Sequence, residues 1–191
     1  MILRSLNMNK YWIIVVIVMC FCINGYTQTY VTKNGMVRFD SQTSMEKIEG
    51  VNRQVNTALI ASTGDFVFKV LIKSFNFEKA MMQEHFNENY LESDKYPEAT
   101  FVGKIVNIKD INFKKDGSSP ATVEGKLTIH GQTKPVKMIG TLDIKNDEAT
   151  AKAKFNILLS DYNISIPNTV VNNISKSIEI TVDVALNKFK N

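Results

Sequence analysis

The chain has 191 residues, of which 44% are hydrophobic and 22% are charged, and its formal net charge is +4. A length of this order suits one domain with a sizeable core. Basic and acidic residues alternate along the chain, which excludes the basic stripe with interleaved aromatic residues that is typical of nucleic-acid binding. We therefore expect no nucleic-acid partner.

Residues 1–27 are predicted to form a secretory signal peptide. Arg4 and Lys10 precede an uncharged apolar run, residues 11–23, which small and polar residues follow. The run is short for a membrane span, which needs about 20 apolar residues. An uncleaved N-terminal anchor is the alternative, because no charged residue follows the run before Lys33. With cleavage we expect no stable membrane span and a net charge of +2, from 21 basic and 19 acidic residues.

Both cysteines, Cys20 and Cys22, lie inside this segment. Met19 and Phe21 precede them where a lipoprotein signal would need small residues, so lipidation is not favoured. The remaining chain has no cysteine and can form neither a disulfide nor a thiolate metal site. Export without disulfides favours a bacterial envelope protein, and we expect a periplasmic or secreted location.

Most of residues 28–191 alternate between apolar and polar positions, as β-strands with one buried face do. The pattern is clearest at residues 66–73, and Asn34-Gly35 predicts a hairpin turn between the first two strands. A single helical turn is expected at residues 44–47, and an irregular or briefly helical segment at residues 167–175. Further strands are expected at residues 30–33, 36–41, 52–61, 99–106, 122–130, 136–143, 151–157 and 178–186. Turns or loops are expected at residues 62–65, 116–120, 131–135 and 146–147.

One segment differs from the strands around it. Residues 78–91 contain neither proline nor glycine, and Met82, Phe86 and Tyr90 follow one another at i, i+4 spacing, which predicts a helix. Tyr96-Pro97 ends the helical region. We expect this short insertion, near residues 78–96, to close the mouth of a barrel. Its two adjacent methionines suit packing on the rim or a soft cover over an apolar ligand.

About eight amphipathic strands joined by short turns predict an all-β fold, either an antiparallel sandwich or a closed up-and-down barrel. Lysine and glutamate on the outward faces argue against an outer-membrane barrel, so a soluble barrel is the leading interpretation. Small residues at inward positions indicate either a cavity or places where strands bend and pack closely. These small residues are Gly103, Gly125, Gly140, Ala151 and Ala153.

No catalytic motif is present after the signal segment, so we predict a non-enzymatic protein without a metal. His85 and His130 are far apart in sequence and read as structural residues. One alternative is a small envelope enzyme that uses His85 with a carboxylate such as Glu84 or Glu88. A further alternative is a structural or interaction module with a solid core.

Three segments carry a family resemblance: Phe68 to Ile105, Val123 to Val136 and Phe155 to Ile180. They resemble the YceI-like family of secreted bacterial lipid-binding proteins, in the form found in Bacteroidetes. The resemblance implies an eight-stranded antiparallel lipocalin-like barrel over residues 28–191 that encloses a long isoprenoid, quinone or other amphiphilic lipid without catalysis. It also makes His130 part of a family motif, Leu127 to Val136.

The expected ligand is therefore an isoprenoid, quinone or fatty-acyl lipid, with no cofactor, and the sequence is compatible with a homodimer. Burial of such a chain is favourable by about 0.8 kcal/mol per methylene group. Strand alternation and the helix supply the candidate lipid-binding residues. They are Phe66, Phe68, Val70, Ile72, Met81, Met82, Phe86, Phe101, Ile105, Leu127, Ile129, Met138, Phe155, Ile157, Ile180 and Val182.

Overall fold

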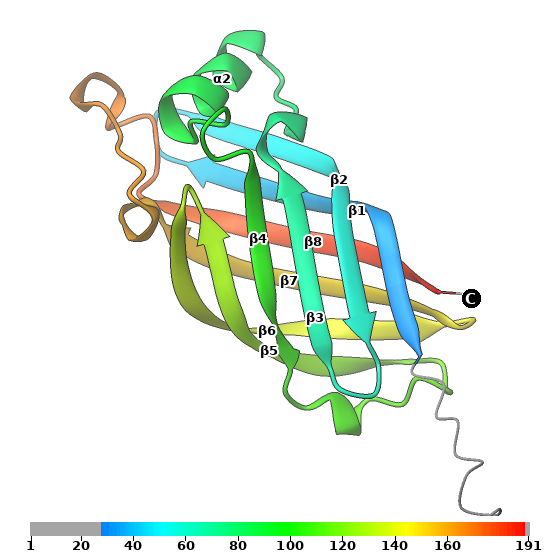
Figure 1. The fold of residues 1–191 in the computed structure, drawn as a ribbon. Helices are drawn as coiled ribbons and strands as arrows, with labels where there is room; N and C mark the ends of the chain where they lie inside the picture. Colours follow the sequence, from blue (N-terminus) through cyan, green and yellow to red (C-terminus); the bar gives the residue numbers. More distant parts are fainter. Residues whose placement is uncertain (1–27, 190–191) are drawn as a thin grey trace, which may run out of the picture.

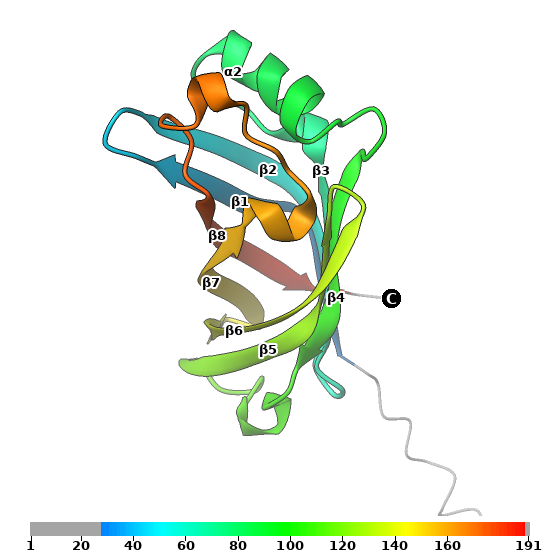
Figure 2. The same cartoon turned by 90° about the vertical axis from the view of Figure 1, so that its left-hand side faces the viewer.

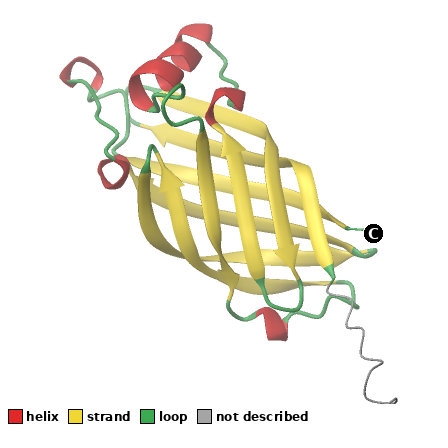
Figure 3. Cartoon of the chain, in the orientation of Figure 1, coloured by secondary structure: helices red, strands yellow, loops and turns green. Residues whose placement is uncertain are grey.

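The computed structural model describes residues 28–189, so the predicted signal peptide lies outside the described residues. Eight antiparallel strands form a closed barrel in which each strand pairs with its neighbour in sequence and β8 pairs with β1 (Figures 1 and 3). The strands are β1 (Thr29–Gln42), β2 (Lys47–Ile60), β3 (Asp65–Leu71), β4 (Glu98–Ile105), β5 (Gly117–Ile129), β6 (Gln132–Lys145), β7 (Glu148–Leu158) and β8 (Ser177–Lys188). The predicted all-β, eight-stranded antiparallel barrel is confirmed.

Short helical segments gather at one end of the barrel, which we call the lid end (Figures 1 and 2). The lid itself, residues 78–96, contains the helix α2 (Ala80–His85) and a π-helical turn, η2 (Phe86–Tyr90). The 3₁₀ turns η1 (Ile72–Ser74), η4 (Leu159–Tyr162) and η5 (Asn168–Val170) lie at the same end. The 3₁₀ turn η3 (Ile108–Asp110) lies at the opposite end, the base. The predicted helical insertion is confirmed. No helix among residues 28–189 has both the length and the apolarity of a membrane span.

The hairpin predicted at Asn34-Gly35 is wrong. Strand β1 continues through these residues, and its register with β2 shifts on both sides of Gly35, which marks a β-bulge. A Cβ atom at Gly35 would lie 2.0 Å from Cγ1 of Val184, so the glycine admits an inward side chain of β8. Asparagine and glycine favour bulges as well as hairpin turns. Because β1 pairs with β2 on one side and with β8 on the other, the chain continues through these residues and forms a bulge instead of a turn.

Three other local predictions also differ from the structure. Residues 44–46 lie at the tip of the β1–β2 hairpin rather than in a helical turn, and the backbone N–H groups of Met45 and Glu46 donate to Oγ1 of Thr43. Most of the loop expected at residues 116–120 is the start of β5, and most of the turn expected at residues 131–135 is the start of β6, where the two strands pair with each other. In these places the pairing of neighbouring strands extends further than the local turn residues indicate.

The interior of the barrel is solid towards the base. The most deeply buried side chains there are at most 4% exposed, and they include Tyr30, Val55, Leu59, Ile144, Ala149, Val184 and Leu186. Ile108 and Ile111 from the segment around η3 belong to the same buried cluster, and the ring of Phe113 lies 5.4 Å from that of Tyr30. Towards the lid end, by contrast, inward residues of β6, β7 and β8 remain partly exposed. A solid core therefore fills only the base half.

Some of the small inward residues mark close packing between strands, and others line a cavity. Gly103 and Gly125 are paired across β4 and β5, and a Cβ atom on either would lie 2.6 to 2.7 Å from Cζ of Phe101. These two glycines make room for one aromatic ring. Ala153 lines a cavity, and Gly140 fits both interpretations, because it lines the same cavity and a Cβ atom on it would lie 2.3 Å from the carbonyl oxygen of Lys152.

Candidate functional site

A cavity of about 330 Å³ occupies the lid half of the barrel. This volume lies within the range of small-molecule sites, roughly 300–1,000 Å³. The inward side chains of the strands form its walls, and Met82, His85, Phe86 and Tyr90 of the lid cover it. The walls are predominantly apolar. Such a surface can exclude water and bury an apolar chain.

All the predicted site residues except Met81 line this cavity. Met81 is 67% exposed, whereas its neighbour Met82 faces inward. Successive residues of an α-helix project about 100° apart, because 3.6 residues make a turn, and here the rotation of the helix turns Met82 inward and Met81 outward. The sequence identified the helix but did not determine its rotation about its own axis.

Three phenylalanines that line the cavity are missing from the predicted set: Phe39, Phe75 and Phe77. Their rings surround Phe86 of the lid, with centroid distances of 5.2 Å for Phe39, 5.4 Å for Phe75 and 5.0 Å for Phe77. Phe39 is stacked on Phe86, with 13° between the ring planes. We call these four residues the aromatic cluster. It packs the lid against β1.

The sequence carried a signal for two of these residues, namely the alternation of apolar and polar side chains in Phe75-Asn76-Phe77. Phe75 and Phe77 flank Asn76, and the backbone of Asn76 exchanges two hydrogen bonds with Val51 of β2, at 3.0 and 2.9 Å. The segment before the lid thus continues the pleated pairing for one residue, which turns both phenyl rings to the same side.

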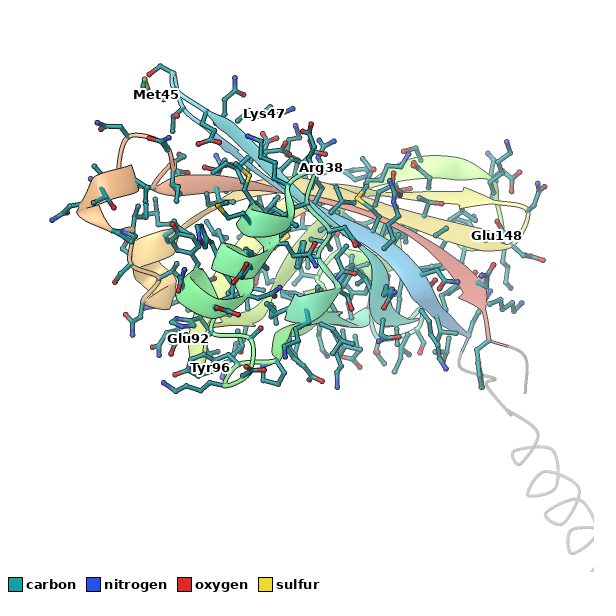
Figure 4. The ribbon with its side chains drawn as sticks, turned by 90° about the horizontal axis from the view of Figure 1, so that it is seen from above. Arg38, Met45, Lys47, Glu92, Tyr96 and Glu148 are labelled. Atoms are coloured by element: carbon teal, nitrogen blue, oxygen red, sulfur yellow. The ribbon has the colours of Figure 1, made fainter. Side chains whose placement is uncertain are left out.

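His130 fastens the other edge of the lid. The Nδ1 atom donates to the backbone carbonyl of Tyr162 in η4 at 3.0 Å, because that carbonyl can only accept. The Nε2 atom lies 2.7 Å from Oε2 of Glu92, and the ring of Tyr96 packs edge-on with a centroid distance of 4.6 Å. Glu92 and Tyr96 lie on the same side of the lid in Figure 4. His130 thus joins the β5–β6 turn, the lid and η4, and it lies outside the cavity lining.

Glu46 joins a second group of segments at the cavity mouth. Its Oε2 accepts a hydrogen bond of 3.0 Å from Nδ2 of Asn173, and its Oε1 lies 3.9 Å from Nζ of Lys79. Nearby, the backbone N–H of Ser175 donates to Oγ of the buried Ser41 at 2.9 Å. The tip of the β1–β2 hairpin, the start of the lid and the segment after η5 therefore meet at one carboxylate.

A minority of the residues that line the cavity are polar, and they include His85 and Tyr90. His85 is exposed, and no hydrogen bond or ion pair within residues 28–189 joins it to Glu84 or Glu88. Burial raises the pKa of the Tyr90 phenol above its ordinary value of 10.0, so this cavity-lining hydroxyl is neutral at physiological pH. The part of the chain that the structure describes contains no cluster of three histidine or acidic side chains that could hold a metal ion.

The chain is similar in sequence to a known family and to known proteins. A family model described as a YceI-like domain matches residues 28–186. A UPF0312 protein of Pseudomonas putida (strain W619) is 33% identical over 98 residues, which is 48% of this chain and 47% of the relative. A UPF0312 protein of strain GB-1 has the same identity and coverage. The chain thus matches about half the length of these relatives.

Solved structures extend the likeness in fold over most of the chain. A domain of Saccharophagus degradans described as polyisoprenoid-binding has a TM-score of 0.74 at 11% identity, covering 85% of this chain and 99% of that one. BcnA of Burkholderia cenocepacia has a TM-score of 0.66 at 19% identity, covering 80% and 95%. A YceI protein of Campylobacter jejuni has a TM-score of 0.56 at 18% identity, covering 74% and 85%.

Proposed function

Because this chain belongs to the YceI-like domain family, we propose that it is a binding protein that sequesters or carries a long-chain apolar lipid in the barrel. The observation that carries the proposal is the cavity in the lid half, whose apolar walls remain partly exposed. The Saccharophagus degradans domain of the same fold, described as polyisoprenoid-binding, supports the same class of ligand. An isoprenoid, a quinone or a fatty-acyl chain meets this description, and no catalytic step is proposed.

The physical basis is apolar burial. Each methylene-sized group that leaves water contributes about 0.8 kcal/mol, so three or four isoprene units supply over ~10 kcal/mol before the cost of ordering the chain. An enclosed cavity collects this energy better than an open groove, because lid and walls cover the chain on all sides. The neutral Tyr90 phenol and the polar residues near the mouth, such as Glu46 and Asn173, suit the head group.

The proposed location follows from the N-terminal segment. A cleaved signal peptide over residues 1–27 would deliver a single domain, residues 28–191, to the periplasm or the medium. Determining the N-terminal residue of the protein from the envelope fraction tests this part separately. Cleavage near residue 27 is expected, and an intact N-terminus in the membrane fraction would favour the anchor.

Lipid binding is tested by native mass spectrometry of the protein as purified from the cell envelope. We expect a non-covalent adduct with the mass of an isoprenoid, quinone or fatty-acyl lipid. A protein that is free of ligand, and that takes up neither a polyprenol nor a fatty acid offered in detergent, would contradict the proposal.

A matched pair of variants places the ligand in the cavity. Ala153→Phe fills part of the cavity, whereas Ile139→Phe adds a ring on the outside of β6, where Ile139 is 70% exposed. Overfilling a packed site costs about 1–3 kcal/mol, so we expect Ala153→Phe to weaken lipid uptake about tenfold. Uptake by Ile139→Phe should match that of the wild type.

A further inference from the structure

The hydrogen-bonded wall of the barrel is interrupted between β6 and β7. The two strands pair with each other over only six residues each, and the pairing stops at Gly140, which lies opposite Ala153. Both strands continue beyond this last pair towards the lid end, β6 with residues 132–139 and β7 with residues 154–158. In Figure 2, β6 diverges from β7 in this region, and β8 is visible between them. We call this unpaired stretch the seam.

Each strand of the seam is paired along its other side. β6 pairs with β5 as far as Gln132, and β7 pairs with β8 as far as Leu158. Proline lacks a backbone N–H group and is confined in sheets to edges and bulges, and Pro135 lies in the part of β6 that borders the seam. The seam therefore separates two complete hairpins, β5–β6 and β7–β8, which the last pair at Gly140 joins.

The side chains on the outside of the wall follow the same division. Lys137 of β6 lies 2.8 Å from Glu124 of β5, and Lys154 of β7 lies 2.8 Å from Glu179 of β8. Each lysine thus pairs away from the seam, and no ion pair among the described residues crosses it. Ile139, next to the last pair on β6, is 70% exposed and gives the outer rim an apolar side chain.

The cavity reaches the seam from inside. Met138 of β6 and Phe155 of β7 would lie opposite each other if the pairing continued for two more residues, and both line the cavity. Both are partly exposed. Gly140 and Ala153, the last pair, line the same cavity. An apolar chain in the cavity therefore has the seam directly beside it.

Every other way out of the cavity is closed by contacts. The base is filled by the buried core, and at the lid end the aromatic cluster, His130 and Glu46 hold the lid in place. Parting β5 from β6 would break the pairing of thirteen residues on each strand, and each hydrogen bond contributes about 0.5–1.5 kcal/mol. Parting β6 from β7 along the seam breaks no backbone pairing.

The seam is also bounded at both ends. The pair of Gly140 and Ala153 closes it towards the base. At the lid end, Nδ1 of His130 in the β5–β6 turn donates to the carbonyl of Tyr162 in η4, which directly follows β7. These two connections allow the strands between them to move apart without separating the two hairpins.

We propose that the seam is the passage through which the apolar lipid chain enters and leaves the cavity. The inference rests on the proposed function and adds the route to it. The chain passes sideways between Met138 and Phe155 while the lid stays in place. Loosening the lid end adds a second route and does not block the first.

Bridging the seam with a covalent linker tests the passage. Both native cysteines lie within residues 1–27 and are replaced by serine, so introduced cysteines carry the only thiols. Ile139→Cys/Lys154→Cys places one thiol on each rim, and a bismaleimide long enough to span the rims joins them, as mass spectrometry verifies. The matched control, Thr141→Cys/Lys152→Cys, bridges the same two strands on the same outer face, where they are already paired.

We expect the bridge across the seam to slow the exchange of a fluorescent fatty acid about tenfold or more, because the strands can no longer part. Stopped-flow displacement measures the rate against the same variant before bridging. The Kd should not change, since closing a route lowers the rates of entry and exit equally. The control bridge should change neither quantity.

The outcomes separate the passage from lipid binding. Equal exchange rates with the seam bridge and the control bridge would overturn the passage and leave lipid binding untouched. A seam bridge that raises the Kd without slowing dissociation would also overturn it, because the bridge would then act on the cavity itself. If the protein takes up no fatty acid even before bridging, the proposed function fails and the passage fails with it.

Discussion

His130 shows at the scale of a single residue how a sequence motif acquires a structural role. Its φ of +50°, followed by +71° at Gly131, makes the two-residue β5–β6 connection a type I′ turn. That turn presents the imidazole between the backbone of η4 and the carboxylate of Glu92. Nδ1 of His130 carries a hydrogen, because it donates to the carbonyl of Tyr162. The contact of 2.7 Å between Nε2 and Oε2 of Glu92 is a hydrogen bond only if a second hydrogen lies between these two atoms. Loss of the imidazole leaves two acceptors without their partner.

The variant His130→Asn isolates this role, because asparagine tolerates a positive φ and keeps the turn but cannot span both contacts. We expect the free energy of unfolding to fall by about 2 kcal/mol, the usual cost of buried hydrogen bonds that include a charged partner. Urea denaturation measures it. In a double-mutant cycle with Glu92→Ala the two losses should be less than additive. Additive losses would show that the pair does not act together, and Glu88→Ala on the exposed side of the lid is the control.

Tyr162 gives a pH dependence. Burial, and secondarily the charge of Asp161, raises the pKa of its phenol above the ordinary value of 10.0. The folded state therefore disfavours the phenolate, so the contribution to stability is complete below pH 10 and is lost as the pH rises through the folded-state pKa. We expect unfolding to become easier above pH 10 and Tyr162→Phe to reduce that loss, as measured by urea denaturation at pH 8 and pH 11. If Tyr162→Phe loses as much stability between pH 8 and pH 11 as the wild type does, the loss belongs to the other phenols with a raised pKa, those of Tyr30 and Tyr90.

The lid is the element on which enclosure of the cavity depends. Its short helix has no side-chain cap at its N-terminal residue, Lys79, and none of its residues is fully buried. Helices of this length are marginal in isolation, so packing must hold it in place. The aromatic cluster supplies that packing on one side, and His130 supplies it on the other.

We expect Phe86→Ala to loosen the lid. Phenylalanine-to-alanine changes in a core cost about 3–5 kcal/mol, and partial exposure of Phe86 lowers the expected loss to about 2 kcal/mol. Hydrogen exchange should accelerate over residues 80–96 and remain unchanged in β5 and β6. Met81→Ala, on the outer side of the same helix, should change neither quantity. Protection of residues 80–96 that survives Phe86→Ala would contradict the role of the cluster.

Glu46 joins segments on the other side of the mouth. Partly exposed ion pairs contribute about 0–1 kcal/mol, so Glu46→Ala should leave the free energy of unfolding almost unchanged. Because this carboxylate joins the β1–β2 tip to Lys79 and Asn173, its loss should accelerate the exchange of a fluorescent fatty acid several-fold. Stopped-flow displacement measures the rate. The control is Glu49→Ala, which removes only the contact with Lys47, and an equal acceleration in that variant would disprove the specific role of Glu46.

The whole molecule is a barrel with a packed half and a hollow half. The boundary runs across individual strands: on β7, Ala149 is fully buried, whereas Ala153, on the same inward face, lines the cavity. The packed base supplies stability, which allows the lid half to remain open for a ligand.

This division predicts opposite responses to the same substitution on β7. Ala149→Phe overpacks the base and should lower the free energy of unfolding by about 1–3 kcal/mol. Ala153→Phe enters free space and should change it by less than about 1 kcal/mol. Chemical denaturation of the ligand-free protein compares them. Equal losses in the two variants would mean that the lid half is packed as tightly as the base.

Much of this architecture was predictable from the sequence. Alternation with a period of two predicted the inward faces of β3 to β8, and the residues that it selected there, such as Phe68 and Phe155, line the cavity. Prediction failed where local residues permit more than one geometry. Asn34-Gly35 suits a turn or a bulge, and either Met81 or Met82 suits the inner face of a helix.

The sequence by itself determined the all-β class and the position of the helical insertion through short-range periodicity, and its local motifs indicated the family, whose resemblance implied the closed barrel. Only the tertiary structure decided which half of the barrel is hollow, since a cavity is the difference between side-chain volume and the space that eight strands enclose. It also brought Phe39 to Phe86 and His130 to Glu92. Such contacts join residues more than 35 positions apart, and no local pattern encodes them because they form only when the barrel closes.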